Sequence, residues 1–333
     1  MRHVVDIAEP SAVAEARRMA RQLTEGAGLS EERGEAAAIV ATEMATNLLR
    51  HAGGGQILLQ VQPGRPATLA LAAIDRGPGI ADPDAALADG YSTAGSAGGG
   101  LGAMRRLADG FEMRSTPGAG TVVLCRFGRA RPVLGGVEAG AFLMNYPGDR
   151  ACGDAFAARD VGGRVDLAVI DGLGHGPRAQ DAAEEAVAGL GAQRGDDPAQ
   201  SLTALSKGLA GSRGSVIGLA QIEAAERRLR FAGIGNISAM VFGGDGRLRR
   251  LICREGRIGG QTRTPPVEQV DFTPGDTLIL HSDGLASIRS IGELPQMAGA
   301  SCAMIAAQLM QGRNRGRDDA CALVARLAMT EGA

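Results

Sequence analysis

The fold of the second half of this chain is decided by the stretch Asp171-Gly172-Leu173-Gly174-His175-Gly176. The residues before it, 164–170, are mainly apolar, which predicts a buried strand that ends at Asp171. The residues after it, 177–193, predict a helix. A carboxylate at the end of a strand can ligate a metal ion, and Gly172 has no side chain to keep the ion or its water molecules away. The stretch therefore predicts a metal ligand held between a strand and a helix.

Three more aspartates lie at predicted strand ends or junctions in the same half. They are found in the phrases Ala151-Cys152-Gly153-Asp154, His281-Ser282-Asp283-Gly284 and Gly316-Arg317-Asp318-Asp319. Hard divalent cations prefer carboxylate oxygens, and two such ions about 3.5–4 Å apart need several aspartates from separate strands. The pattern therefore predicts a dinuclear metal site that activates water.

The remaining segments of the second half predict a strand-rich domain with a few helices. Such a mixture indicates a β-sandwich flanked by helices. Strands are expected at 137–146, 154–159, 164–170, 214–222, 228–234, 237–242, 247–252, 276–282 and 320–327, and helices at 177–193, 198–210 and 301–312.

The first half predicts a different unit, in which helices cover a sheet. Helices are expected at 11–25, 31–51 and 101–108, and strands at 56–62, 68–75 and 120–127. The short, basic, proline-ended stretch 128–132 marks the boundary between the halves. The sequence thus predicts a two-domain α+β chain with domains at 1–129 and 133–329.

Polar residues and glycines of the first half are suited to binding a nucleotide. Glu43 and Asn47 are four residues apart on a predicted helix and share one face. An amide oxygen is a good ligand for Mg²⁺, and a nearby carboxylate can accept a proton. Asp75 ends a strand, where it can accept a hydrogen bond from an exocyclic amine such as that of adenine. Glycines that let the backbone approach such a ligand follow Asp75 or open a helix: Gly77, Gly79, Gly98, Gly99, Gly100 and Gly102.

The composition argues against nucleic acid and membrane as partners. The 333 residues have a net charge of −2 and 3% aromatic residues with no Trp, so nothing favours binding to nucleic acid or to an anionic membrane. Five cysteines without a C-x-x-C pair favour reduced thiols over zinc ribbons or disulfides. The sequence shows no signal peptide and no run of about 18 apolar residues, so a cytoplasmic location is expected.

The first half resembles the histidine-kinase-like (Bergerat) ATPase fold and, within it, the anti-sigma-factor and stressosome switch serine kinases. The resemblance rests on Glu43-Met44-Ala45-Thr46-Asn47, Asp75-Arg76-Gly77-Pro78-Gly79, Asp89-Gly90-Tyr91-Ser92-Thr93, Gly98-Gly99-Gly100-Leu101-Gly102 and Gly120-Thr121. It implies that ATP and Mg²⁺ bind here, with Asn47 on the metal, Glu43 as general base and Asp75 on adenine. It also places a set of residues around the nucleotide: Gly77, Gly79, Gly100, Leu101, Gly102 and Thr121.

The second half resembles the PPM-type metal-dependent serine/threonine phosphatases, nearest to the stressosome-resetting phosphatases akin to the sporulation phosphatases. The resemblance rests on the aspartate phrases above and on Gly233-Ile234-Gly235-Asn236. It implies an α-β-β-α sandwich that binds two Mn²⁺ or Mg²⁺ ions, with Asp171 and Asp283 needed for catalysis. Gly153 stands where eukaryotic members have Glu, which implies that one metal binds more weakly. The implied metal ligands are Asp154, Asp171, the Gly172 carbonyl, Asp283 and Asp318.

Together the two resemblances imply a bifunctional regulator that phosphorylates and dephosphorylates serine or threonine. In the resembled pathway both activities act on STAS-type scaffold or antagonist proteins that control a sigma factor or a stress response. A sigma factor or a downstream signalling enzyme is a further candidate partner. An alternative stays open, in which the first domain binds ATP without catalysis and serves as an anti-sigma or regulatory binding module for a phosphatase.

Overall fold

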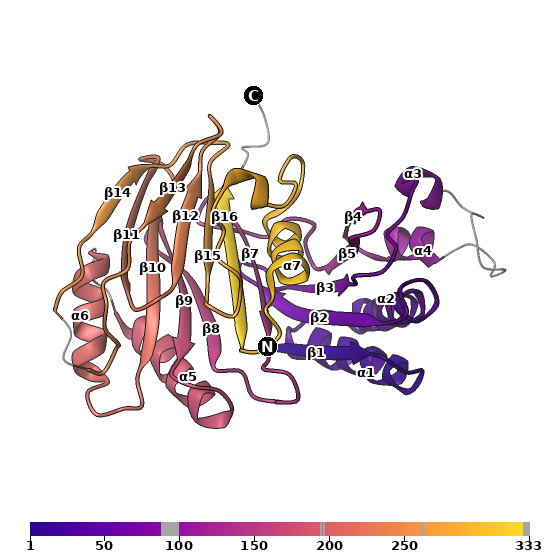
Figure 1. The fold of residues 1–333 in the computed structure, drawn as a ribbon, viewed down its shortest axis with the longest axis horizontal. Helices are drawn as coiled ribbons and strands as arrows, with labels where there is room; N and C mark the ends of the chain where they lie inside the picture. The colour runs from indigo at the N-terminus through magenta and orange to yellow at the C-terminus, as the bar shows by residue number, and fades with distance from the viewer. Residues whose placement is uncertain (88–99, 194, 196, 261–262, 329–333) are drawn as a thin grey trace. The chain divides into compact units, whose positions relative to one another are not determined.

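The structure is a computed structural model that describes residues 1–87, 100–193, 195, 197–260 and 263–328. It divides into two compact units, Met1–Pro132 and Val133–Ala333 (Figure 1). Each unit has a hydrophobic core of its own. In the described parts of the chain, no helix is both long enough and apolar enough to cross a membrane.

The first unit is a five-stranded antiparallel sheet with helices packed against it. The strand order is β1-β2-β3-β5-β4, and α1 and α2 pack on each other and on the sheet. The core between them contains Val40 and Met44 from α2 and Leu59 and Leu71 from the strands. The elements are β1 (Arg2–Ile7), α1 (Ser11–Gly26), α2 (Glu31–Asn47), β2 (Gly55–Gln62), β3 (Thr68–Ile74), α3 (Pro83–Ala86), α4 (Gly100–Leu107), β4 (Gly110–Thr116) and β5 (Gly120–Phe127).

The ends of α2 are set by local sequence. Ser30 is the N-cap, and its hydroxyl accepts a hydrogen bond from a backbone N–H of the first turn. The helix expected at 31–51 is α-helical only as far as Asn47, because residues Leu48–Ala52 form a π-helical turn. Gly53 ends this turn in the left-handed conformation that glycine adopts without strain. Insertions of this kind are frequent at functional sites, and this one directly follows Asn47.

Two strands of the first unit lie outside the prediction, and both are edge strands. β1 and β4 are the first and last strands of the sheet. Only two of the six residues of β1 are buried, and none of the seven residues of β4 is buried. Because edge strands carry polar residues and lack a continuous apolar run, they give a weak sequence signal.

The second unit is a sandwich of two antiparallel sheets with helices on both outer faces, which is the α-β-β-α arrangement that the resemblance implies. The strand orders are β14-β11-β10-β9-β8 and β13-β12-β15-β16-β7-β6. Helices α5 and α6 cover the first sheet and α7 packs on β7 and β16 of the second (Figure 1). The elements are β6 (Val133–Leu134), β7 (Val137–Met144), β8 (Asp154–Val161), β9 (Arg164–Gly172), α5 (Pro177–Ala192), α6 (Pro198–Gly208), β10 (Ser215–Glu223), β11 (Arg228–Ile234), β12 (Ser238–Phe242), β13 (Leu248–Leu251), β14 (Glu268–Asp271), β15 (Thr277–His281), α7 (Cys302–Arg313) and β16 (Ala320–Leu327).

Strand β9 is buried on both faces, and this position places Asp171. Leu167 and Val169 point into the core between the two sheets, whereas Ala168 and Ile170 pack beneath α5 and α6. The alternation follows from the two-residue period of a strand. The apolar run therefore ends where the sheet ends, and Asp171 is the first polar side chain to emerge there.

Candidate functional site

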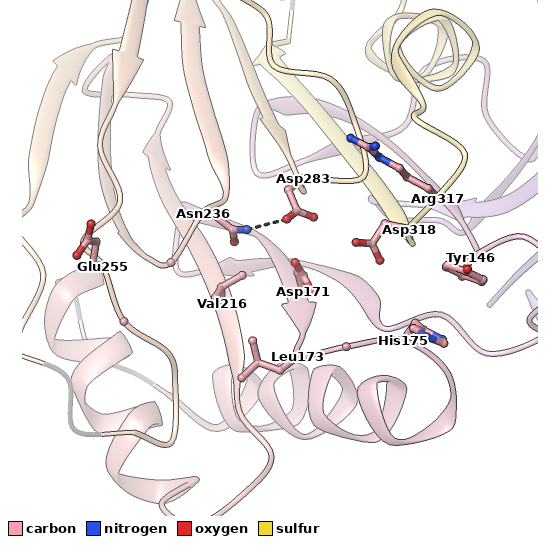
Figure 2. A pocket seen from close by; sticks show the side chains of 13 residues that line it. Tyr146, Asp171, Leu173, His175, Val216, Asn236, Glu255, Asp283, Arg317 and Asp318 are labelled. Carbon is pink, nitrogen blue, oxygen red and sulfur yellow. Dashed lines mark hydrogen bonds between the residues drawn. The ribbon is translucent and has the colours of Figure 1, made fainter.

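Three of the predicted metal ligands line one cavity of the second unit. Asp171 lies near the end of β9, Asp283 follows β15 and Asp318 precedes β16. The cavity has a volume of about 520 Å³, and Figure 2 shows the three carboxylates converging on it. Since β9 belongs to one sheet and β15 and β16 to the other, both sheets contribute to the site.

Asp154, the fourth predicted side-chain ligand, is buried beside them. It begins β8 and pairs with Asp171 across the β8–β9 ladder. Its side chain is 4% exposed, and its Oδ2 accepts a hydrogen bond of 2.5 Å from Ser282 Oγ. Burial, followed by the charge of Asp171, raises the pKa of Asp154 well above its usual value. A carboxylate in such surroundings is stable as an anion only when a positive charge compensates it.

Burial and neighbouring negative charges also raise the pKa of two cavity carboxyls. The pKa of Asp171 is raised to about 7, first by burial and then by the charges of Asp283, Asp318 and Asp319. The pKa of Asp318 is raised as well, again mainly by burial. Carboxylates gathered in this way concentrate negative potential in one place. Divalent cations suit this set of donors, because they prefer oxygen ligands and supply the missing positive charge.

The fit to a metal ion rests on the chemistry of these donors and not on a preformed coordination geometry. Within the described ranges, no group of three or more His, Cys, Asp or Glu side chains is arranged so that it could hold a metal ion as it stands. Three carboxylates nevertheless converge on the cavity, and burial raises the pKa of Asp154, Asp171 and Asp318, as is expected for carboxyls in need of a compensating positive charge. This combination fits hard divalent cations such as Mg²⁺ and Mn²⁺.

Glycines let the chain pass close to itself around the carboxylates. A Cβ atom at Gly172 would overlap the carbonyl oxygen of Ala179, and one at Gly153 would lie 2.8 Å from the Cβ of Ala179. The N–H of Gly153 also donates to Asp319 Oδ2 at 2.8 Å. A glutamate at position 153 would therefore have no room here unless α5 moves.

Asp319 holds the loop before β8 in place. Its side chain is 3% exposed. Its Oδ1 accepts a hydrogen bond of 2.7 Å from the N–H of Tyr146, and its Oδ2 accepts one from Gly153. Both oxygens are thus engaged by backbone donors of the same loop, so Asp318 remains the better ligand candidate of the two.

The rim of the cavity contains residues that the sequence motifs did not assign. The rings of Tyr146 and His175 stack with centroids 4.5 Å apart and an angle of 14° between their planes. His175 Nδ1 lies 3.1 Å from Asp149 Oδ2, which adds a polar contact to the stack. Arg317 is the one Lys or Arg among the described residues that line the cavity. Figure 2 shows Tyr146 and His175 on one side of the cavity and Glu255 on the other.

In the first unit, Asp75 is held just after β3 by backbone donors. Its Oδ1 accepts hydrogen bonds from the N–H groups of Gly77 (2.8 Å) and Thr121 (3.2 Å). Burial raises the pKa of the Asp75 carboxyl. Ser115, which lies outside the prediction, belongs to the same network. Its Oγ is 2.8 Å from the hydroxyl oxygen of Thr121 and accepts a hydrogen bond from the N–H of Ile80.

The start of α4 lies against the end of α2. A Cβ atom at Gly100 would be 2.9 Å from Glu43 Oε2 and 3.6 Å from the side-chain amide oxygen and nitrogen of Asn47. The fold therefore brings together three of the residues proposed to act at the phosphate end of a nucleotide. Leu101 and Gly102 follow in the same turn of α4.

The loop after β3 needs its two predicted glycines. Gly79 has a φ of 72°, and a Cβ atom there would overlap the carbonyl of Thr116. A Cβ atom at Gly77 would lie 2.8 Å from the Cα of Ala52, in the π-helical turn. Other parts of the predicted nucleotide site lie outside the described residues: Asp89-Gly90-Tyr91-Ser92-Thr93, Gly98 and Gly99.

Comparison with protein families defines both units. The chain belongs to the family described as Stage II sporulation protein E (SpoIIE), which matches residues 161–328. Residues 7–127 match the family described as Histidine kinase-like ATPase domain. These matches confirm the two resemblances and the α+β fold class expected from the sequence.

Two proteins of Bacillus subtilis (strain 168) are similar to separate parts of the chain. The serine/threonine-protein kinase RsbT is 41% identical over 83 residues, which are 25% of this chain and 62% of RsbT. The chain thus spans less than two thirds of the length of RsbT. The phosphoserine phosphatase RsbX is 21% identical over 144 residues, which are 43% of this chain and 72% of RsbX.

Two solved structures share the fold. One, described as "The bacterial stressosome: a modular system that has been adapted to control secondary messenger signaling", matches with a TM-score of 0.53 and 26% identity over 57% of this chain and 99% of its own. The other is RsbX in complex with magnesium, with a TM-score of 0.52 and 20% identity over 58% of this chain and 96% of its own. The second likeness supports the fold alone.

Proposed function

We propose that this chain is a bifunctional signalling regulator. Residues 133–329 act as a metal-dependent protein serine/threonine phosphatase, and residues 1–129 act as an ATP-dependent serine/threonine kinase. The observation that carries the proposal is the convergence of Asp171, Asp283 and Asp318 on one cavity, with Asp154 buried beside them. The similarity to RsbX supports the phosphatase activity, and the similarity to RsbT supports the kinase activity.

The phosphatase site would hold two Mn²⁺ or Mg²⁺ ions through Asp154, Asp171, the Gly172 carbonyl, Asp283 and Asp318. Bound divalent cations supply Lewis acidity that lowers the pKa of water and neutralises phosphate charge. The protein itself contributes a cavity in which strand ends fix the carboxylates. Arg317 lines the same cavity, and its planar guanidinium is suited to a phosphate group.

The kinase site would use the contacts between α2 and α4. Asn47 would hold Mg²⁺, Glu43 would accept the proton of the attacking hydroxyl, and Asp75 would accept a hydrogen bond from adenine. The position of Gly100 against Glu43 and Asn47 leaves no side chain between these groups and the start of α4. STAS-domain proteins are the proposed substrates, which the first domain would phosphorylate and the second would dephosphorylate. The likeness to a stressosome structure supports this class of partner.

Hydrolysis of p-nitrophenyl phosphate tests the phosphatase. Protein freed of metal should gain activity when Mn²⁺ or Mg²⁺ is added. Asp171→Asn and Asp283→Asn should lose it, whereas the control Asp271→Asn, an exposed residue of β14, should retain it. Full activity in Asp171→Asn would contradict the assignment of the site.

Transfer of labelled phosphate from ATP to a purified STAS-domain protein tests the kinase. The wild type should transfer phosphate and Glu43→Gln should not, while both bind ATP. ATP binding without any transfer would instead support the alternative of a non-catalytic anti-sigma or regulatory module. A stable complex with a sigma factor would then identify the first domain as an anti-sigma module, and no such complex would favour a regulatory module.

A further inference from the structure

Two neutral donors each hold one oxygen of a proposed metal ligand. Asn236 Nδ2 donates to Asp283 Oδ2 at 2.8 Å, and Ser282 Oγ donates to Asp154 Oδ2 at 2.5 Å. Neither donor is acidic, so neither adds charge to the site. Figure 2 draws the Asn236 hydrogen bond on the side of Asp283 away from Asp318. In both cases one oxygen of the carboxylate accepts a hydrogen bond from the protein.

The direction of the Asn236 hydrogen bond is set by chemistry. An ionised carboxylate can only accept, so the amide must present its NH₂ group to Asp283. The backbone before Asn236 is fixed as well, because the N–H of Gly235 donates to the carbonyl of Arg254 at 2.7 Å. Gly235 has a φ of 100°, and a Cβ atom there would overlap Val216. Asn236 is therefore presented to the cavity from a constrained turn.

The Ser282 hydrogen bond is equally directed. The side chain is fully buried, and its Oγ accepts a hydrogen bond of 2.9 Å from the N–H of Cys321. With one lone pair occupied in this way, the hydroxyl hydrogen is aimed at Asp154. Residues from β8, the end of β15 and β16 are joined by this chain of two hydrogen bonds.

A donor group at one carboxylate oxygen changes how the other oxygen can bind a cation. The N–H or O–H group presents its positive end, which disfavours a cation that would share the same oxygen. Because one lone pair of that oxygen is already engaged, each carboxylate binds a cation preferentially through its second oxygen. Ca²⁺ takes six to eight oxygen ligands and often binds carboxylates through both oxygens, whereas Mg²⁺ keeps octahedral geometry with single contacts.

We propose that Asn236 and Ser282 are positioning residues that keep Asp283 and Asp154 to one metal-facing oxygen each, and that they thereby select Mn²⁺ and Mg²⁺ over Ca²⁺. The inference rests on the proposed phosphatase function, because it assumes that these aspartates hold metal ions. It goes beyond that function by assigning the choice of metal to two uncharged side chains.

Metal titration of the full-length protein tests the inference. Protein freed of metal with a chelator is titrated with MnCl₂ and CaCl₂ in a calorimeter, and the ratio of the two affinities is the readout. Loss of partners that orient metal ligands typically costs 10–100-fold in affinity. In Asn236→Ala the Mn²⁺ affinity should fall by about this factor and the Ca²⁺ affinity much less, so the ratio should fall at least about tenfold.

Two further variants make the result decisive. Asn236→Asp has the same shape but cannot donate, so its ratio should fall too, although its extra charge raises the affinity for both ions. Glu255→Gln changes the charge of the same cavity at a residue that is not a proposed ligand, and its ratio should change less than about twofold. Circular dichroism confirms that each variant is folded.

The outcomes separate the inference from the function on which it rests. An unchanged ratio in folded Asn236→Ala and Asn236→Asp would overturn the inference while the phosphatase assignment stands. A uniform loss of affinity for both ions would show a merely structural role and would also overturn it. Wild-type protein that binds neither ion would contradict the proposed function itself.

Discussion

Replacing Asp171 with asparagine is expected to stabilise the metal-free protein at about pH 8, although the same change should abolish the phosphatase. Burial and the charges of Asp283, Asp318 and Asp319 raise the pKa of Asp171 from its usual 3.8 to about 7. At pH 8 the folded protein therefore keeps an ionised group in unfavourable surroundings. Asparagine fills nearly the same volume without the charge, so this cost disappears.

The sign and the size of the effect follow from the two pKa values. As the pH rises from about 4 to about 7, the unfolded chain ionises Asp171 while the folded protein keeps it protonated, so the free energy of unfolding falls. Each pH unit in this window costs about 1.4 kcal/mol, which gives a total on the order of 4 kcal/mol above pH 7. Below about pH 4 the carboxyl is protonated in both states and the cost vanishes.

Scanning calorimetry in the presence of a chelator measures the effect at about pH 8 and pH 4.5. The relevant unfolding transition is the one that added Mn²⁺ shifts in the wild type. Asp271→Asn, exposed on β14, is the control and should change stability by less than about 0.5 kcal/mol. A variant that is no more stable than the wild type at pH 8, or that is stabilised equally at both pH values, would refute the reasoning.

Three further changes test packing and the two sites. Gly172→Ala should lower the free energy of unfolding by at least about 3 kcal/mol, because the new methyl group would overlap the carbonyl of Ala179. The control Gly191→Ala in α5 should raise it by up to about 1 kcal/mol, because its methyl group would meet nothing within 4 Å. Thermal melting compares the two, and equal midpoints would contradict the expectation. Ser282→Ala should cost about 1–3 kcal/mol because it removes two buried hydrogen bonds, one to Asp154 and one from the N–H of Cys321. Urea unfolding measures the cost, and an unchanged midpoint would argue against these contacts. Asn47→Ala should weaken binding of a fluorescent ATP analogue about tenfold in Mg²⁺ and much less in EDTA; equal losses in both would show that Asn47 does not address the metal.

The positions of the candidate ligands were predictable because their signals are local. An apolar run closed by Asp-Gly describes both the end of β9 at Asp171 and the segment after β15 at Asp283, and each can be read from a few neighbouring residues. The same holds for α2, where Ser30 and the buried alanines define the helix. Buried strands and capped helices depend mainly on residues next to them in sequence.

The contacts that orient those ligands could not be predicted in the same way. Ser282 and Asp154 are 128 residues apart, and Tyr146 and Asp319 are 173 residues apart. A serine or a backbone N–H carries no sign of its distant partner, since only the packing of two sheets brings them together. The partnership of Ser115 with the predicted nucleotide site has the same cause, because Ser115 lies on β4, an edge strand with a weak sequence pattern.

Position 153 links the packing of the second unit with the charge of its proposed metal site. A side chain there would meet Ala179 and Asp319, so a glutamate cannot be accommodated while α5 stays in place. The four proposed aspartate ligands carry four negative charges, which two divalent cations would balance. Asp319 is already a fifth buried carboxylate beside them, and its charge helps to raise the pKa of Asp154 and Asp171. A glutamate at position 153 would add one more negative charge next to Asp319, with no further cation to compensate it.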